Sequence, residues 1–270
     1  MHKIVVVIPV YKDPDECEMV SLRQCCKILG CYDICLVAPE GFDTQLFRSV
    51  YMSYQVSIKE ERFSPSFFEN IQGYNRLMLS KEFYLRFCEY DYMLIYQLDA
   101  YVFRDELKDW CSLGYDYVGA PIIGKFEETV YNSTMPMRVG NGGFSLRKID
   151  RYIDFFLGKK NVFSSQQIIK KISLWEKPYT RIFVWLLMML GWRNKPQSVA
   201  NRWRYNEDDF WSGLLDESIY RLNKPSVREA LDFSFEKYPS EMFKITQKLP
   251  LGCHAWKKYD YENFWKCYIK

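Results

Sequence analysis

The stretch YMLIYQLDAYVF, residues 92–103, decides the fold. It has the apolar density of a buried strand, yet it carries an aspartate, Asp99, just before its end. A charge is expensive to bury unless another group pairs with it. We therefore expect the rest of the chain to supply a partner for Asp99.

Strand and helix patterns alternate before this stretch. Residues 4–10 (IVVVIPV) form a continuous apolar run rich in β-branched residues, typical of a strand covered on both faces, and residues 33–39 form the next strand. Between them, the sequence predicts a helix with Asp13 as its N-cap, Pro14 at its first position and Gly30 at its end. The alternation predicts an α/β protein with a mostly parallel central sheet flanked by helices.

The same alternation continues on both sides of residues 92–103. Residues 64–87 read as one long helical region, and residues 115–123 as a fourth strand. Because parallel sheets bind ligands at the carboxyl ends of their strands, Asp99 is expected to lie at a ligand crevice. The alternative is an aspartate that only caps the next turn.

Composition limits the kind of molecule. With 270 residues, 48% of them hydrophobic, the chain can bury a large core. Its net charge of +3 and the lack of a dense Lys/Arg run give no indication of a nucleic-acid partner. The nine cysteines are odd in number and include no CxxC pair, so we expect reduced, buried thiols in a cytoplasmic protein. No pattern indicates the oligomeric state.

From about residue 148 the pattern becomes more helical. Residues 181–192 are the most hydrophobic stretch, but their apolar part, residues 182–190, is too short to span a bilayer. A buried helix is the favoured interpretation. The alternative interpretation is a helix that contacts a membrane surface or a partner. It is based on the basic and tryptophan residues in and around this stretch, which are Arg181, Trp185, Trp192, Arg193 and Lys195.

Standard catalytic motifs are absent from the sequence. It contains no Walker-type phosphate loop, no GxGxxG and no GxSxG. Only His2 and His254 are available as histidines, so a zinc site of two or three histidines or a catalytic triad is disfavoured.

Three short motifs remain as candidate sites. VGNGGFSLR (residues 139–147) places glycines around Asn141, where the backbone can approach a ligand closely or form a hairpin turn. YNEDDFWSG (residues 205–213) has three successive acids, which a helix dipole also favours. LPLGCHAWKKYD (residues 249–260) holds His254, which is either a site residue or a core histidine.

Taken together, YQLDAYVF, GNGGFSLR, NEDDFW and GCHAW resemble the motifs of GT-A-type nucleotide-sugar glycosyltransferases, in particular bacterial glycosyltransferase-like proteins. The resemblance runs from the first strand nearly to the last residue. It implies a GT-A-like, Rossmann-related sheet and one catalytic domain over residues 1–270. Residues 1–123 would form the nucleotide-binding half and residues 124–270 the acceptor-side half.

The resemblance also implies a set of residues that bind the nucleotide-sugar donor. They come from the first strand and its loop, the GYNRLMLSKEF helix, the Asp99 segment and the glycine motif. The expected donor-binding residues are Pro9, Val10, Tyr11, Tyr74, Asn75, Arg76, Gln97, Asp99, Asn141, Gly142 and Gly143.

A divalent cation, Mn²⁺ or Mg²⁺, is implied as the cofactor, but the metal-binding motif departs from the family pattern. Where similar enzymes have LDADV, this sequence has LDAYV, so the second acid is replaced by Tyr101. The resemblance then implies Asp99 and His254 as the metal ligands. Without a metal, Arg76, Lys257 or Lys258 would stabilise the leaving diphosphate.

Roles for the acids and aromatic residues follow from the same resemblance. Asp208 is the expected catalytic base that deprotonates an acceptor hydroxyl, with Glu207 and Asp209 as alternatives. The expected acceptor-binding residues, which include three aromatic side chains able to stack on sugars, are Asp209, Phe210, Trp211 and Trp256.

The expected function is transfer of a sugar from a nucleotide-sugar donor to a glycan or lipid-linked acceptor in bacterial surface polysaccharide synthesis. The expected location is the cytoplasm, with peripheral contact to the inner face of the membrane as an option. The alternative is an inactive GT-A-fold protein that binds carbohydrate or acts as a scaffold, and the Tyr101 departure favours it. A metal-independent nucleotidyltransferase is a third interpretation.

Overall fold

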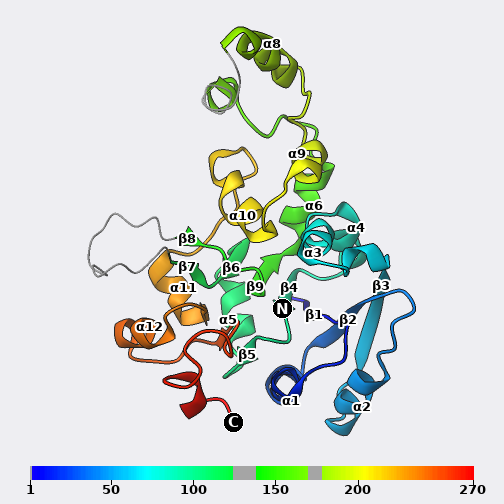
Figure 1. Cartoon of the computed structure of the whole chain (residues 1–270), viewed down its shortest axis with the longest axis vertical. Helices are drawn as coiled ribbons and strands as arrows, with labels where there is room; N and C mark the ends of the chain where they lie inside the picture. Colours follow the sequence, from blue (N-terminus) through cyan, green and yellow to red (C-terminus); the bar gives the residue numbers. More distant parts are fainter. Residues whose placement is uncertain (1, 124–137, 170–177) are drawn as a thin grey trace.

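A six-stranded mixed sheet forms the centre of the molecule (Figure 1). The computed structural model describes residues 2–123, 138–169 and 178–270. The strand order in the sheet is β3-β2-β1-β4-β9-β6. The first four of these strands are parallel, whereas β9 runs antiparallel to both of its neighbours. The predicted α/β class with a mostly parallel sheet is confirmed.

The strands of the central sheet and of two small accessory sheets have the following bounds. They are β1 Ile4–Pro9, β2 Asp33–Pro39, β3 Ile58–Phe63, β4 Tyr92–Tyr96, β5 Tyr101–Val102, β6 Tyr117–Gly119, β7 Pro121–Ile122, β8 Arg138–Val139, β9 Phe144–Lys148, β10 Ser234–Phe235 and β11 Gly252–Cys253. β10, β11 and β5 form one accessory sheet, and β7 and β8 form the other.

The helices are mostly short. They are α1 Glu16–Leu29, α2 Gln45–Ser53, α3 Ile71–Met78, α4 Lys81–Arg86, α5 Leu107–Ser112, α6 Ile149–Leu157, α8 Pro178–Met189, α9 Pro196–Arg202, α10 Glu207–Ser212, α11 Val227–Phe233 and α12 Pro239–Thr246, with single 3₁₀ turns at Pro65–Phe67, Leu214–Glu217 and Trp265–Cys267.

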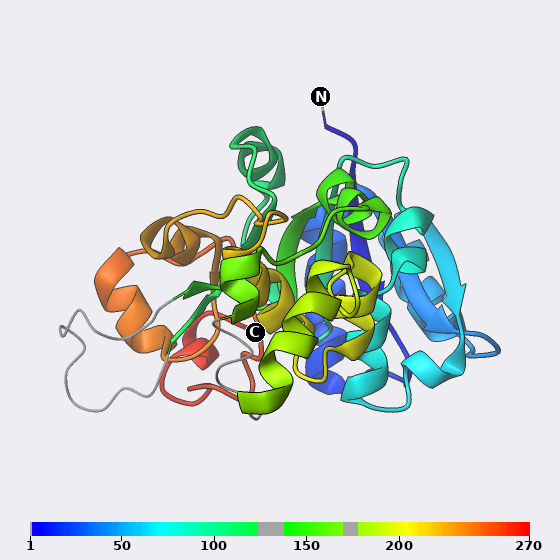
Figure 2. The same cartoon turned by 90° about the horizontal axis from the view of Figure 1, so that it is seen from above.

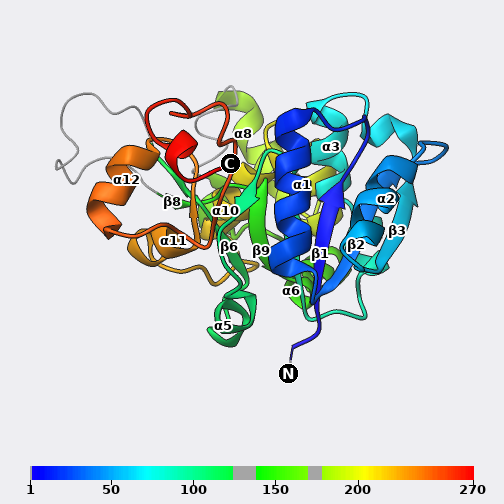
Figure 3. The same ribbon diagram turned by 90° about the horizontal axis from the view of Figure 1, so that it is seen from below.

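Both faces of the sheet are covered, as the continuous apolar pattern of β1 predicts. Val5 and Val7 belong to a core cluster shared with α3, α4 and α6, whereas Val6 and Ile8 belong to a cluster shared with α1 and α2. All four side chains are fully buried. Figure 3 shows α1 and α2 in front of the sheet on one face.

The two halves expected from the sequence build one sheet together. β9, which comes after residue 123, lies between β4 and β6, which come before it. Figure 2 shows the N-terminal elements at one end of the molecule and the orange and red C-terminal elements at the other. The division into a nucleotide-binding half and an acceptor-side half stays a prediction.

Side-chain caps shift or break the predicted helices. The first helix begins after Asp15, not Asp13, because Asp15 and Glu18 form a reciprocal capping box. It ends at Gly30 as predicted. The single helical region predicted for residues 64–87 is wrong, since Asn70 and Ser80 each accept a backbone N–H as an N-cap and start separate helices, α3 and α4.

The strand predicted over residues 92–103 is also divided. β4 ends at Tyr96, the backbone turns with Ala100 N donating to Gln97 O, and β5 then pairs with β11 in a separate sheet. Asp99 therefore lies in a loop after β4, and 48% of its side chain is exposed. The expectation of a charge buried inside a strand is corrected.

The buried helix predicted for residues 181–192 is only half right. Val184, Trp185 and Met188 of α8 pack against the core, but Phe183 and Leu190 are exposed. Within the residues that the structure describes, no helix is both long and apolar enough to cross a bilayer. The nine cysteines, all of which lie in the described ranges, are free thiols. The expectation that they are buried holds for five of them, whereas Cys17 is half-buried and Cys31, Cys88 and Cys267 are exposed.

Candidate active site

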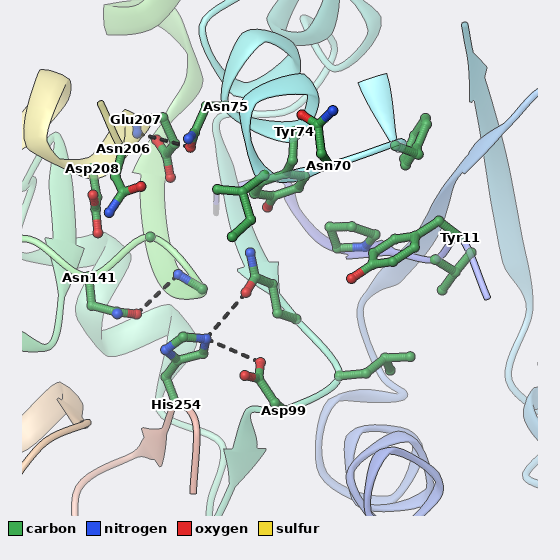
Figure 4. A pocket seen from close by; sticks show the side chains of 18 of the residues that line it. Tyr11, Asn70, Tyr74, Asn75, Asp99, Asn141, Asn206, Glu207, Asp208 and His254 are labelled. Atoms are coloured by element: carbon green, nitrogen blue, oxygen red, sulfur yellow. Dashed lines mark hydrogen bonds and ion pairs between the residues drawn. The ribbon is translucent and has the colours of Figure 1, made fainter. Parts of the chain in front are cut away.

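A cavity of about 610 Å³ opens at the carboxyl ends of β1 and β4 (Figure 4). Its size suits a small organic ligand. Most of the residues predicted as site residues meet in its wall, although they come from distant parts of the sequence. The predicted residues that line it are Pro9, Val10, Tyr11, Tyr74, Asn75, Gln97, Asp99, Asn141, Gly142, Gly143, Glu207, Asp208, His254 and Lys258.

His254 and Asp99 form an ion pair at one side of the cavity. The Nε2 atom of His254 lies 3.1 Å from Asp99 Oδ1 and 3.2 Å from Gln97 Oε1, and its Nδ1 atom lies 3.4 Å from Glu236 Oε1. Burial alone would lower the pKa of His254, but the hydrogen bonds with Asp99 and Glu236 outweigh it and raise the pKa to about 9. The partner that Asp99 was expected to need is therefore His254.

The glycine motif forms the loop that separates the two charged clusters. It is not a hairpin turn, because β8 pairs with β7 whereas β9 pairs with β4 and β6. Asn141 Oδ1 accepts the N–H of Gly143 at 3.0 Å and fixes the loop. A Cβ atom on Gly142 would lie 2.1 Å from Glu207 Oε1, and one on Gly143 would lie 2.1 Å from His254 Nε2. A side chain at either position would displace Glu207 or His254 from its observed place.

Glu207 is held at the opposite side of the cavity by a buried arginine. Arg147 Nη2 lies 2.7 Å from Glu207 Oε1, and the side chains are 0% and 5% exposed. Arg147 also donates hydrogen bonds to Tyr84 Oη at 3.0 Å and Ser145 Oγ at 3.1 Å. Burial raises the pKa of Glu207, while Arg147 opposes this shift. The Oε2 atom of Glu207 is buried and has no hydrogen-bond partner in the described chain.

The other polar groups of the wall differ in how they are held. Asn75 Oδ1 accepts the backbone N–H of Glu207 at 3.1 Å, which joins α3 to the start of α10. Tyr74 Oη, like Glu207 Oε2, is buried and unpartnered within the described residues. Asp208 Oδ1 accepts the N–H of Asp209 at 2.8 Å, and burial raises the pKa of Asp208. Unpaired buried polar groups are rare and are expected to meet a ligand or water.

Six predicted residues do not reach the cavity, and Lys257 is one of them. Arg76 is exposed on α3, and its guanidinium lies 3.5 Å from Ser66 O. Asp209 points away and forms an ion pair with Arg138. The other three are aromatic core residues that are at most 2% exposed, so they offer no face for a sugar to stack on. They are Phe210, Trp211 and Trp256.

Several residues that build the site were not predicted from the sequence. Glu236 bonds to His254, and Asn70 and Asn206 line the cavity. No pattern marks Glu236, whereas Asn206 opens the NEDDFW motif and the N-cap position of Asn70 could have been recognised. Arg147 carried a signal too, since it directly follows Phe144-Ser145-Leu146 in a predicted apolar segment, where a charge needs a buried partner.

The groups around Asp99 do not fit a pre-formed divalent-cation site. A cation of this type needs several oxygen ligands, but the carboxylate of Asp99 already bonds to His254 at 3.1 Å. Tyr101, at the position of the second acid, is 7% exposed and packs on Phe103 and Trp256. The described residues contain no cluster of three or more His, Cys, Asp or Glu side chains that could hold a metal ion.

A family model described as "Protein of unknown function (DUF5672)" matches residues 57–254, more than two thirds of the chain. The chain belongs to this family. The DUF5672 match includes Asp99, Asn141, Arg147 and Glu207 and ends at His254. The residues that carry both charged clusters therefore lie inside the family region.

The DUF5672 chain is also similar to solved structures of glycosyltransferases. They include galactosyltransferase LgtC with donor and acceptor sugar analogues (12% identity, 93% of this chain and 86% of that chain, TM-score 0.48). The apo-form glycosyltransferase GlyE of Streptococcus pneumoniae TIGR4 is 14% identical over 94% of this chain and 54% of that chain, with a TM-score of 0.46. Core-mannan synthase A of Aspergillus fumigatus, in a Mn/GDP form, is 10% identical over 78% and 72%, with a TM-score of 0.43.

The chain spans about half the length of the pneumococcal glycosyltransferase. A comparison with curated protein sequences found no significant match.

The pKa of His254 predicts a pH dependence of stability. Because the pKa is about 9 in the folded protein and 6.5 ordinarily, the stabilisation is complete below pH 6.5 and is lost as the pH rises through 9. In the His254→Gln variant the glutamine side chain does not bind a proton in this pH range, so its ion pairs are absent at every pH. We expect the difference in free energy of unfolding between wild type and His254→Gln to shrink from pH 6.5 to 9, measured by urea unfolding. A difference that stays constant over this range would contradict the ion pairs assigned to His254.

Proposed function

We propose that the protein is a glycosyltransferase that moves a sugar from a nucleotide-sugar donor to a glycan or lipid-linked acceptor. The observation that carries the proposal is the meeting of four distant motifs in one cavity at the carboxyl ends of parallel strands. Asp99, Asn141, the Glu207-Asp208 pair and His254 all line it. These are the motif residues on which the resemblance to GT-A-type enzymes rests.

The donor is proposed to enter beside β1. Tyr11 is 52% exposed in the cavity wall and lies 6.4 Å from Phe68 between ring centroids, so it offers a free aromatic face for a nucleobase. Asn75 and Gln97 add hydrogen-bonding groups near the sugar. The unpartnered hydroxyl of Tyr74 would accept or donate a hydrogen bond to the donor.

The negative charge of the leaving diphosphate is proposed to be met by this chain's own cations. The imidazolium of His254 and the ammonium of Lys258 both face the cavity. Arg76 does not line the cavity, and Lys257 is not among the lining residues either. No metal ion takes part in the proposed reaction, since the groups around Asp99 do not form a pre-formed cation site.

Asp208 is proposed as the catalytic base. Glu207 is paired with Arg147, whereas the Asp208 carboxylate accepts hydrogen bonds from backbone N–H groups, those of Asp209 and Gly142. The raised pKa of Asp208 brings its basicity closer to neutral pH. Asp208 takes the proton of the acceptor hydroxyl while that oxygen bonds to the anomeric carbon and the bond to the diphosphate breaks. Glu207 Oε2 is free to accept a hydrogen bond from the acceptor or the sugar.

The remaining parts of the proposal rest on the motif resemblance. They are a single catalytic domain over residues 1–270, a location in the cytoplasm and a role in bacterial surface polysaccharide synthesis. One observation favours a second candidate, an inactive carbohydrate-binding protein: the buried Tyr101 replaces an acid that similar enzymes use to hold a metal.

Donor binding separates the two candidates. We expect one nucleotide class among UDP-, GDP- and CMP-sugars to bind, measured by isothermal titration calorimetry with Mn²⁺ and again with EDTA. Lys258→Ala and His254→Gln should each weaken binding about tenfold or more, because a charge-assisted hydrogen bond to phosphate is lost. Lys257→Ala is the matched control and should bind normally.

The effect of EDTA on donor binding shows which group neutralises the diphosphate. Binding that persists in EDTA supports neutralisation by His254 and Lys258. Binding that requires Mn²⁺ would transfer that role to a cation brought with the donor phosphates. No binding of any nucleotide sugar would overturn the transferase and favour the carbohydrate-binding protein.

Substitution of the proposed base should separate catalysis from binding. Asp208→Asn removes the proton acceptor but keeps the shape of the side chain, so we expect turnover of the bound donor to fall about 100-fold or more with an unchanged Kd. Asp209→Asn, which alters an acid paired with Arg138 outside the cavity, is the control and should retain turnover. Near-normal turnover of Asp208→Asn would remove it as the base.

A further inference from the structure

One face of α8 presents a group of exposed apolar side chains. They recur at the spacing of a single helical face and continue just past the end of the helix. Their exposed fractions range from 38% for Met189 to 84% for Leu190. The members of this outward face are Ile182, Phe183, Leu186, Met189, Leu190 and Trp192. Contiguous exposed apolar surface of this kind marks an interaction site.

The opposite face of α8 is anchored to the body of the protein. Trp185 and Met188 pack against the core cluster. At the end of the helix the buried Asn194 donates hydrogen bonds to Phe163 O at 3.0 Å and to Met188 O at 3.2 Å. Asn161 Nδ2 also donates to Met189 O at 2.9 Å. These contacts fix which face points outward, and Figure 1 shows α8 projecting at one end of the molecule, away from the central sheet.

The surroundings of this face are basic. Residues 178–206 contain five Lys/Arg residues and no Asp or Glu, although the whole chain has 37 basic and 34 acidic residues. Arg193 lies with its guanidinium 3.9 Å from the ring centroid of Trp192, directly beside the apolar face. Lys195 Nζ donates to Lys159 O at 2.6 Å, so exposed Lys159 lies at the same end of α8.

The apolar face of α8 and its basic surroundings together favour one kind of binding partner. A second copy of the chain seated on the same face would bring two basic segments together, and like charges oppose such contact. An apolar face beside cationic side chains matches the interface of an anionic bilayer, where apolar groups enter the headgroup region and Lys/Arg contact lipid phosphates. With 12 residues, α8 is suited to lie in this plane and not to cross it.

We propose that the outward face of α8 docks on the surface of an anionic membrane. Phe183, Leu186 and Leu190 enter the interfacial layer, Trp192 lies at the headgroup level, and Arg193 with Lys159 contacts the lipid phosphates. The proposal does not depend on the glycosyltransferase function. A lipid-linked acceptor, if used, would be presented to the protein at the surface to which α8 binds.

Vesicle co-sedimentation of the full chain tests this proposal. We expect binding to vesicles of phosphatidylcholine mixed with phosphatidylglycerol, weaker binding to phosphatidylcholine alone, and loss of the difference as salt is raised. Phe183→Ser combined with Leu190→Ser should lower the partition coefficient about tenfold or more. Leu46→Ser combined with Met52→Ser, which removes two exposed apolar groups from α2, is the control and should bind as wild type.

Two further measurements keep the result decisive. Thermal unfolding of the Phe183/Leu190 variant must match that of the wild type, since its side chains are exposed. Arg193→Gln combined with Lys159→Gln should reduce binding to anionic vesicles alone. Absence of vesicle binding, or binding unaffected by the Phe183/Leu190 variant, overturns the proposal. A wild-type dimer that this variant converts to a monomer would assign the face to a second copy and also overturn it.

Discussion

The buried ion pair between Arg147 and Glu207 is the constraint on which the cavity depends. Burying two charges costs several kcal/mol of desolvation, so such a pair persists only when its geometry is good and its other hydrogen bonds are satisfied. Here Arg147 bonds to Tyr84 and Ser145 as well as to Glu207. It thereby joins α4, β9 and α10 at a single buried point. Among the described residues one oxygen of Glu207 has no hydrogen-bond partner, which leaves the pair one bond short unless a ligand or water supplies it.

The glycine motif follows from this constraint. Two charged side chains, Glu207 from α10 and His254 from the segment after β11, converge on the same loop from opposite sides. A Cβ atom on Gly142 or Gly143 would occupy the space that these side chains need. The motif therefore serves to bring an acid, paired with Arg147, and an imidazolium, paired with Asp99, to the two sides of one cavity. In the proposed reaction the imidazolium side meets the diphosphate of the donor, and the acidic side meets the acceptor hydroxyl.

The sequence predicted which residues form the site better than it predicted the helices and strands that carry them. Asp99 was recognised because a charge in an apolar run needs a partner, and His254 because the resemblance placed it beside Asp99; the structure pairs the two. What failed depends on tertiary contacts that no local pattern carries. Periodicity cannot distinguish aromatic residues that stack on a ligand from those that fill a core, so Trp211 was misplaced. Likewise β4 ends at Tyr96 because its continuation pairs in a second sheet with β11, about 150 residues later in the chain.

A double-mutant cycle on Arg147 and Glu207 tests this account most directly. Arg147→Met strands a buried carboxylate and should lower the free energy of unfolding by about 3–5 kcal/mol, measured with urea. Glu207→Gln should also destabilise the protein. The account predicts that the double variant loses clearly less stability than the sum of the two single losses, by about 1 kcal/mol or more. Losses that add to within about 0.5 kcal/mol would show that the two side chains are not coupled, and would contradict the central role given to this pair.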